Sequence, residues 1–426
     1  MQKQQELRKR KTFALGYSYV GVSLISYFLT LFCTTGILNT FRASFAEKSG
    51  IAATTLLSVV TISGILSQLV NIFLGKVLVS RAGVRVCASV SLIMGGLFGF
   101  ILLSQVNTLA GWIVSVTILQ CASVGYGTNP ANTLISAWFR KRINTVLGLS
   151  DIGTSFVSLL GIPVVTKLLA LYGFETASII CGVFMICLGI IYFLWIRNRP
   201  EDVGMYPDNR PFTEEELQAH NERKTQARLW TLKDLFTNKQ AWLIAIAFAC
   251  FIFTLTGAGS NRVAWIMEFG YERAAAVQIN SNLAWLGVIS SVISGFVVDK
   301  IGQRKTVIGY AVIAILSYAS ILVFPGQRAM MFVVVSVMYI TGGVWTNLLS
   351  STTIKVFGAE SYPSVSRMIL PCAMILRSLC YVYTGQFEAF LGSISAAYAG
   401  FGVVALLGLI LFLFIDTSKL QTPKEK

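Results

Sequence analysis

Residues 295–305 read GFVVDKIGQRK, so a cluster of charged side chains interrupts the chain where a long apolar segment ends. A related stretch, KVLVSRAGVRV at residues 76–86, lies about half the chain earlier. Both copies keep two basic residues and a glycine at the same spacing, namely Arg81, Gly83 and Arg85 in the first and Lys300, Gly302 and Arg304 in the second. Asp299 has no counterpart, because Ser80 stands at its position. The chain is therefore predicted to be an internal duplication.

A second pair of segments supports the duplication. GYGTN at residues 125–129 and GVWTN at residues 343–347 are separated by nearly the same length of chain as the first pair. Tyr126 and Trp345 lie in these segments, and we include both among the predicted substrate-binding residues.

The composition predicts a membrane protein. With 426 residues, 55% hydrophobic and 12% charged, and a mean hydropathy of +0.69, the chain has too little charge to cover a soluble globule. Apolar segments of about 20 residues, long enough to cross a hydrocarbon core of about 30 Å as helices, recur between polar breaks. The sequence predicts an all-α membrane protein with twelve spans in two pseudo-symmetric six-helix halves: 13–39, 51–75, 84–104, 109–136, 144–171, 174–196, 240–262, 276–298, 306–325, 329–350, 363–390 and 393–415.

The net charge of +15 follows the positive-inside rule if the N-terminus lies in the cytoplasm. Both termini, the central loop and the loops after the even-numbered spans then hold most of the 34 basic residues on the cytoplasmic side. The exceptions are Arg377 within a span and, on the outside, Arg42, Lys48, Lys167, Arg262, Arg273 and Arg328. This distribution predicts a multi-pass protein of the cytoplasmic (inner) membrane with both termini in the cytoplasm.

Residues 197–239 mix basic and acidic residues with prolines and the only histidine, His220. They are predicted to form a cytoplasmic linker between an N-terminal half at 1–196 and a C-terminal half at 240–426. The eight cysteines lie in apolar segments without a C-x-x-C pair, so neither a disulfide framework nor a metal site is predicted.

Arg377 lies about 15 residues into the eleventh predicted span, near the middle of the membrane at about 1.5 Å per residue. A charge there costs roughly 2.5–3.5 kcal/mol on insertion scales, so it needs a partner. Tyr381, Thr384 and Glu388 follow on the same helical face. Because a guanidinium binds a carboxylate in bidentate fashion and a tyrosine adds a donor, Arg377 and Tyr381 are predicted to bind an anionic substrate. The alternative is a structural pair that locks helices together.

Asp151 is the only acidic residue well inside a predicted span, where it shares a helical face with Ser155 and Ser158. A protonatable carboxylate at this position is predicted to couple transport to a proton gradient. A structural ion pair with Arg367 or with a loop arginine is the competing interpretation.

The seventh predicted span ends in TGAGSNR at residues 256–262, which is poor helix-forming sequence. Loosened backbone at membrane depth is tolerated only where it lines a cavity or is buried in protein. This segment is therefore predicted to border the binding site, with Asn261 among the substrate contacts. The alternative is an ordinary helix end.

The motif at 295–305, its partial copy, the twelve spans and the central loop together resemble the major facilitator superfamily of transporters. In that family Gly-x-x-x-Asp-Arg/Lys-x-Gly-x-Arg/Lys joins the second and third helices of each half. Asn132-Thr133, the segment WFRKR at 138–142 and residues 200–208 resemble the oxalate/formate antiporter and monocarboxylate porter branch, which also carries a cation in the eleventh span. Ser291 stands about where the branch has a second cation, so the resemblance implies a monoanion rather than a dicarboxylate.

The resemblance also implies cytoplasmic gating contacts. Asp299 is expected to meet the N-terminus of the fifth span and a basic residue beside it. The first half lacks this aspartate, so its contact is expected to be weaker or to use another acid. The predicted gating residues are Asp299 with Arg140 or Arg142, Glu360 with Arg81 or Arg85, and Arg304.

The sequence thus predicts a secondary transporter for a small organic anion, working by alternating access as an exchanger or a proton symporter. We expect a monomer in the lipid bilayer, with no cofactor and no nucleic acid partner. Two alternatives remain: a multidrug/proton efflux antiporter, favoured by the Gly-Ile-Pro at 161–163, and a non-transporting nutrient sensor. An enzyme is disfavoured, because no nucleophile–base or metal constellation occurs.

Overall fold

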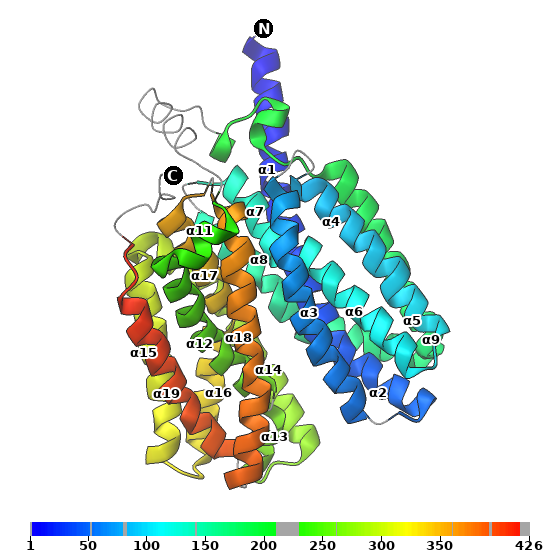
Figure 1. The fold of residues 1–426 in the computed structure, drawn as a ribbon, viewed down its shortest axis with the longest axis vertical. Coiled ribbons are helices and arrows are strands. Elements are labelled where there is room, and N and C mark those ends of the chain that lie inside the picture. Colours follow the sequence, from blue (N-terminus) through cyan, green and yellow to red (C-terminus); the bar gives the residue numbers. More distant parts are fainter. Residues whose placement is uncertain are drawn as a thin grey trace. The chain divides into compact units, whose positions relative to one another are not determined.

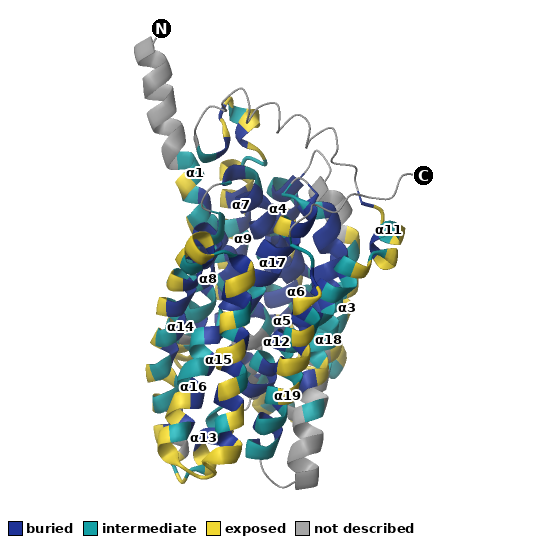
Figure 2. Cartoon of the chain, turned by 90° about the vertical axis from the view of Figure 1, so that its left-hand side faces the viewer, coloured by how far each residue is buried: buried dark blue, intermediate teal, exposed yellow. Residues whose placement is uncertain are grey.

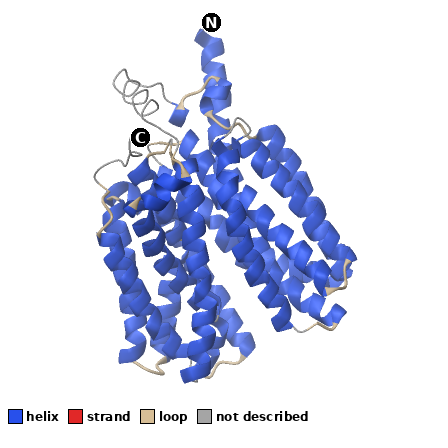
Figure 3. Ribbon diagram, in the orientation of Figure 1, coloured by secondary structure: helices blue, strands red, loops and turns tan. Residues whose placement is uncertain are grey.

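The computed structural model describes residues 2–51, 53–79, 83–140, 143–209, 230–260, 262–359, 361–391 and 394–417. Every regular element within these ranges is a helix, as Figure 3 shows. Nine helices of the described residues are long and apolar enough to cross a membrane. The expected all-α membrane fold is confirmed. One long helix, α9, covers parts of two predicted spans, and several other predicted spans are each divided among two or three helices.

The first half of the chain consists of helices (Figure 1). Short π-helical turns follow α1, α4 and α8 within single predicted spans. Two short 3-10 helices follow the first half. In chain order the elements are α1 (Gln2–Leu31), η1 (Phe32–Gly36), α2 (Ile37–Ser49), α3 (Ala53–Val79), α4 (Gly83–Met94), η2 (Gly95–Ile101), α5 (Leu102–Gln105), α6 (Leu109–Tyr126), α7 (Thr128–Trp138), α8 (Ile143–Phe156), η3 (Val157–Gly161), α9 (Ile162–Trp195), η4 (Pro200–Val203) and η5 (Pro207–Asn209).

The second half begins with a short helix, which Thr231 caps: its hydroxyl accepts a hydrogen bond from the Asp234 backbone N–H. The elements are α11 (Leu232–Thr237), α12 (Lys239–Ser260), α13 (Arg262–Glu268), α14 (Arg273–Ile301), α15 (Gln303–Val323), α16 (Arg328–Gly342), α17 (Val344–Phe357), α18 (Tyr362–Leu391) and α19 (Ile394–Leu413). The seventh predicted span is thus described as two helices, α12 and α13.

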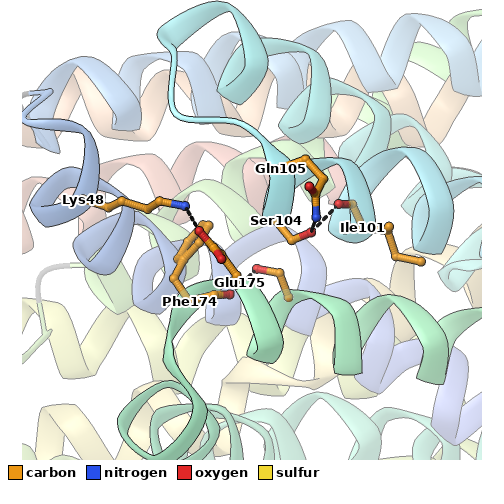
Figure 4. Close-up of polar contacts among 7 residues, drawn as sticks. Lys48, Ile101, Ser104, Gln105, Phe174 and Glu175 are labelled. Atoms are coloured by element: carbon orange, nitrogen blue, oxygen red, sulfur yellow. Dashed lines mark hydrogen bonds and ion pairs between the residues drawn. The ribbon is translucent and has the colours of Figure 1, made fainter.

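Gly173 divides α9 into the fifth and sixth predicted spans. Its backbone has φ 74° and ψ 174°, a conformation that glycine adopts without the steric cost of a side chain. Beside it, Lys48 Nζ donates to Glu175 Oε1 at 2.7 Å and lies 5.4 Å from the centre of the Phe174 ring (Figure 4). These contacts tie the end of α2 to the turn, although an exposed ion pair contributes at most about 1 kcal/mol.

The same helix pairings occur in both halves of the sequence. In the first half α3 packs against α6 and α4 packs against α9, while in the second α14 packs against α16 and α15 packs against α19. α3 and α14 each lead into one copy of the repeated motif, and α4 and α15 each follow it. The pairs are therefore equivalent, which supports the predicted duplication.

Contacts group the chain into two compact units. Unit 1 consists mainly of Met1–Trp230 with Ala359–Arg367, and unit 2 of Thr231–Gly358 with Met368–Gln421. The predicted boundaries at 196 and 240 stay a prediction. The first turns of α18, which belongs to the second half in sequence, group with unit 1.

Each unit has its own aromatic core, and the remaining helix faces are apolar but exposed. Phe41, Phe45 and Trp112 are fully buried in unit 1, as are Trp265 and Tyr398 in unit 2. Figure 2 shows exposed positions recurring between buried ones along α15 and α16. The exposed positions include large apolar side chains such as Leu316, Leu322 and Val333. Such a surface suits lipid rather than water.

Candidate functional site

Arg377 lies near the middle of α18, with its side chain partly buried. Its Nε atom is buried and has no hydrogen-bond partner in the described part of the chain. A guanidinium can only donate hydrogen bonds, so an acceptor such as a carboxylate would complete it. The side chains of Tyr381, Thr384 and Glu388 lie outside those that the structure describes, so the predicted polar stripe stays a prediction.

The other predicted substrate residues differ in their surroundings. The Tyr126 side chain is fully buried, and its hydroxyl lies beside the Cys33 thiol without a hydrogen-bond partner among the described residues. Trp345 is also buried, with its ring stacked on Phe251 at 4.3 Å between ring centres. Asn261 lies outside the described residues. The Tyr126 hydroxyl is therefore a buried polar group without a hydrogen-bond partner among the described residues, whereas the described contacts of Trp345 are those of a core residue.

Asp151 lies in a buried polar cluster of unit 1. Its side chain is fully buried on α8, which packs against α1. The Tyr27 hydroxyl of α1 donates to Asn132 Oδ1 at 2.7 Å and lies within electrostatic range of both Asp151 and Tyr362. α1, α7, α8 and the base of α18 thus bring two tyrosines, an amide and a carboxyl group together.

Arg367 does not pair with Asp151 in this structure. Its Nη2 atom donates to the backbone oxygen of Trp230 at 3.0 Å, and its Nε atom is buried without a partner among the described residues. Arg367 therefore ties the base of α18 to the end of the linker. The loop residues Lys141 and Arg142 lie outside the described residues.

The basic residues of the repeated motif bind the ends of helices in their own half. Arg85 donates through Nε to the Phe193 oxygen at 2.7 Å, with its guanidinium carbon 4.5 Å from the centre of the Phe193 ring. Arg304 donates through Nη2 to the oxygen of Leu413 at 3.1 Å. These carbonyl groups lie in the last turns of α9 and α19, where a cation is favourable.

The predicted gating pairs are only partly within the described residues. Asp299 lies exposed in the last turn of α14, and the Arg140 backbone N–H donates to Asp208 Oδ2 at 3.1 Å. Arg81, Arg142 and Glu360 lie outside the described residues. The gating roles of all these residues stay predictions.

Sequence reasoning missed an amide cluster between α3 and α7. Asn129 Nδ2 donates to Asn71 Oδ1 at 3.2 Å, and Asn71 Nδ2 donates to Gln68 Oε1 at 3.4 Å. The Asn129 Oδ1 atom is buried and accepts no hydrogen bond from a described residue. The repeat GYGTN/GVWTN carried the signal, because its asparagines, Asn129 and Asn347, are both buried.

Two further arginines lie within helices. Arg42 belongs to α2 and Arg262 to α13, and both side chains are partly buried. The Nε atom of each is buried without a hydrogen-bond partner in the described ranges. Each follows a Thr-Gly pair, in TGILNTFR at 35–42 and in TGAGSNR at 256–262. Their predicted place on the outside stays a prediction.

Comparison with known proteins identifies a family model and a relative that this chain resembles. Residues 23–381 match the family model described as Major Facilitator Superfamily. The inner membrane transport protein RhmT of Escherichia coli (strain K12) is 25% identical over 162 residues, which cover 36% of this chain and 37% of RhmT. The match thus spans little more than a third of that relative.

Two solved structures share the fold over nearly their full length. The proton:xylose symporter XylE, bound to 6-bromo-6-deoxy-D-glucose, superposes with a TM-score of 0.73 at 14% identity, covering 96% of this chain and 98% of XylE. FucP in the outward conformation superposes with a TM-score of 0.68 at 14% identity, covering 94% of this chain and 99% of FucP. At this identity the likeness concerns the fold alone.

Proposed function

Since this chain belongs to the Major Facilitator Superfamily of transporters, we propose that it moves a small, monocarboxylate-like organic anion across the cytoplasmic membrane. Transport proceeds by alternating access, in which the binding site opens to one side of the membrane at a time. The chain works as an exchanger or as a proton symporter.

The observation that carries this proposal is the buried Nε atom of Arg377, which has no hydrogen-bond partner among the described residues. A cation in the middle of a membrane helix is unfavourable unless it is paired or hydrated, and no described residue pairs with Arg377 through Nε. A bound carboxylate relieves this cost, because it supplies both the opposite charge and two acceptor oxygens. The same argument disfavours a cationic substrate, which Arg377 would repel.

The polar cluster around Asp151 supports proton coupling. A fully buried carboxyl group can exchange a proton with water only after a conformational change admits water, so its protonation can follow the transport cycle. Tyr27 is a titratable group within electrostatic range of Asp151, Tyr362 lies within the same range of Tyr27, and Asn132 accepts the hydrogen bond of the Tyr27 hydroxyl. If Asp151 does not couple to protons, the transporter is an exchanger.

We place both termini in the cytoplasm, since this orientation puts the repeated basic motif on the cytoplasmic side. Tyr381, Tyr126, Trp345 and Asn261 remain proposed substrate residues beside Arg377. Asp299 and the motif arginines remain proposed members of the cytoplasmic gate.

Purified protein in lipid nanodiscs provides the test. A panel of formate, lactate, pyruvate and benzoate, with oxalate, xylose and the cation ethidium as comparisons, is screened for thermal stabilisation. We expect a monocarboxylate to raise the Tm of the wild type through binding linkage, and to lose this effect in Arg377→Gln. The matched control is Arg328→Gln, because Arg328 is exposed and its Nε already donates to the Phe269 oxygen at 3.2 Å.

Uptake of the stabilising anion into proteoliposomes then separates the function classes. Accumulation or counterflow supports the transporter, and binding without uptake would favour a sensor. Stabilisation by ethidium but by no carboxylate would favour multidrug efflux and would overturn the proposal.

A further inference from the structure

The environment of Arg262 differs from that of an ordinary surface arginine. Its guanidinium carbon lies 4.1 Å from the centre of the Tyr339 ring, so one face of the planar group is covered. Its Nε atom is buried and has no hydrogen-bond partner in the described ranges. The stacked face fixes the plane of the guanidinium, while its Nε–H has no acceptor among the described residues. This is the arrangement that bidentate carboxylate recognition requires.

The nearest acidic side chain on the same helix is already engaged. Glu268 accepts hydrogen bonds from the Ile394 backbone N–H at 2.7 Å and from the Ser395 hydroxyl at 2.9 Å. It therefore holds the start of α19. No ion pair joins Arg262 to a carboxylate of a described residue.

The tyrosine hydroxyl groups around Arg262 already donate hydrogen bonds to other acceptors. The Tyr339 hydroxyl donates to Asn280 Oδ1 at 2.9 Å, which fixes the ring under the guanidinium. The hydroxyl groups of Tyr318 and Tyr398, which lie within electrostatic range of Arg262, donate to the backbone oxygens of Thr254 and Ala258. These residues shape the surroundings of the guanidinium without pairing with it.

Arg262 and Arg377 lie on opposite sides of one helix contact. A Cβ atom on Gly257 would lie 3.2 Å from the Cys380 Cβ atom, so α12 and α18 meet there. Arg262 follows Gly257 toward α13, and Arg377 precedes Cys380 toward the start of α18. Arg262 comes five residues after Gly257, and Arg377 comes three residues before Cys380.

The first half carries an arginine in a similar stretch of sequence. Arg42 lies six residues after the glycine of Thr35-Gly36, and Arg262 lies five residues after the glycine of Thr256-Gly257. The Nε atom of Arg42 is likewise buried without a partner among the described residues. A cation that occurs twice at a costly position is more readily explained by a ligand than by chance.

We propose that Arg262, stacked on Tyr339, forms a second anion-binding position in unit 2, at which a small carboxylate binds on its way to or from Arg377. This inference rests on the proposed function, because it assigns the same class of substrate to a second guanidinium. The two positions are occupied one after the other during transport, or together when the anion is in excess.

Equilibrium dialysis with radiolabelled lactate and benzoate, using protein in nanodiscs, tests the proposal. We expect two binding positions in the wild type, one in Arg262→Gln, one in Arg377→Gln, and none in the double variant. Arg328→Gln is the matched control. The guanidinium carbon of Arg328 also lies over a tyrosine, 5.0 Å from the centre of the Tyr271 ring, but its Nε donates to the Phe269 oxygen. Loss of a charge-assisted contact should raise the Kd of the affected position by about tenfold or more.

Gly259→Ala gives a second test that keeps every charge. The added Cβ atom would lie 3.1 Å from Arg262 Nη2, so the guanidinium must shift by a few tenths of an ångström. We expect it to weaken the Arg262 position alone.

The outcomes distinguish the two proposals. The wild type could instead show one binding position, which Arg262→Gln and Gly259→Ala leave unchanged and Arg377→Gln removes. That result overturns the proposed position at Arg262 and leaves the proposed function standing. Binding of neither anion to the wild type overturns both.

Discussion

Arg304 donates through Nη2 to the carbonyl oxygen of Leu413, the last residue of α19, at 3.1 Å. In the first half, Arg85 makes the equivalent contact through Nε to Phe193 in the last turn of α9. The two arginines occupy the same position of the repeated motif, and each binds the end of the sixth span of its own half. The motif thus stabilises each half by itself, in addition to any role between conformations.

Arg85→Ala should destabilise the protein more than Arg304→Ala. Both substitutions remove a cation from free helix carbonyls, a contribution of about 0.3–1 kcal/mol. Arg85 also stacks on the Phe193 ring, which adds about 0.5–1 kcal/mol at an exposed site. Thermal unfolding in nanodiscs measures the difference, with Arg85→Lys expected to lie between the wild type and Arg85→Ala. A larger loss of Tm in Arg304→Ala would show that the ring contact contributes nothing.

Asp299→Asn should abolish most transport while leaving the amount of protein in the membrane unchanged. Asp299 is exposed at the end of α14, so neutralising it leaves no cavity and little change in stability. The expected loss comes from a weakened cytoplasmic gate. Uptake into proteoliposomes measures it, with the exposed neighbour Lys305→Gln as a control for charge. Normal uptake by Asp299→Asn contradicts the gating assignment.

Much of the fold could be predicted because a bilayer imposes a strong pattern on the sequence. The length of the apolar segments predicted the spans. Gly173, with its non-helical backbone, separates the fifth and sixth spans at the predicted place. Local chemistry was sufficient for these features.

The partners of the site residues could not be predicted, because they depend on packing between distant segments. The sequence left open whether Arg367 pairs with Asp151, and the structure places its Nη2 on the Trp230 oxygen instead. The stacking of the Trp345 ring on Phe251 of α12 could not be predicted either, and the role of Trp345 in substrate binding stays a prediction. Nor could the contact of Arg262 with the Tyr339 ring be predicted, because a charge near the end of a span has the same local sequence whether it faces water or an aromatic ring.

Gly96→Ala should impair folding, because α9 crosses η2 at van der Waals contact. A Cβ atom on Gly96 would lie 2.6 Å from the backbone oxygen of Gly182. A backbone atom cannot move out of the way as the end of a flexible side chain can. Overpacking of this kind costs about 1–3 kcal/mol. Gly64→Ala is the matched control, since no atom lies within 4 Å of its Cβ position. Monodisperse yield and Tm measure the effect, and an equal result for the two variants contradicts the close crossing.

Asp151→Asn should remove the response of transport to an imposed pH gradient while retaining exchange of substrate. The substitution keeps the size of the buried side chain but leaves no proton to exchange. Uptake is measured with and without a pH gradient across the same proteoliposomes, with Ser155→Ala on the same helical face as a control. If wild-type transport already ignores the gradient, the coupling assignment fails and the protein is an exchanger.

Arg377 is the residue on which the anion assignment depends, and two substitutions separate its charge from its geometry. Arg377→Lys keeps the charge but loses the planar pair of donors, so the KM should rise while transport continues. Arg377→Gln removes the charge and should abolish anion binding, because a neutral amide cannot offset the cost of a carboxylate leaving water. Binding is measured by thermal shift and transport by counterflow, so a variant that misfolds is recognised by its basal Tm. Unchanged affinity of Arg377→Gln for the wild-type substrate would mean that the substrate is not anchored by this cation, and a neutral ligand would then fit the site better.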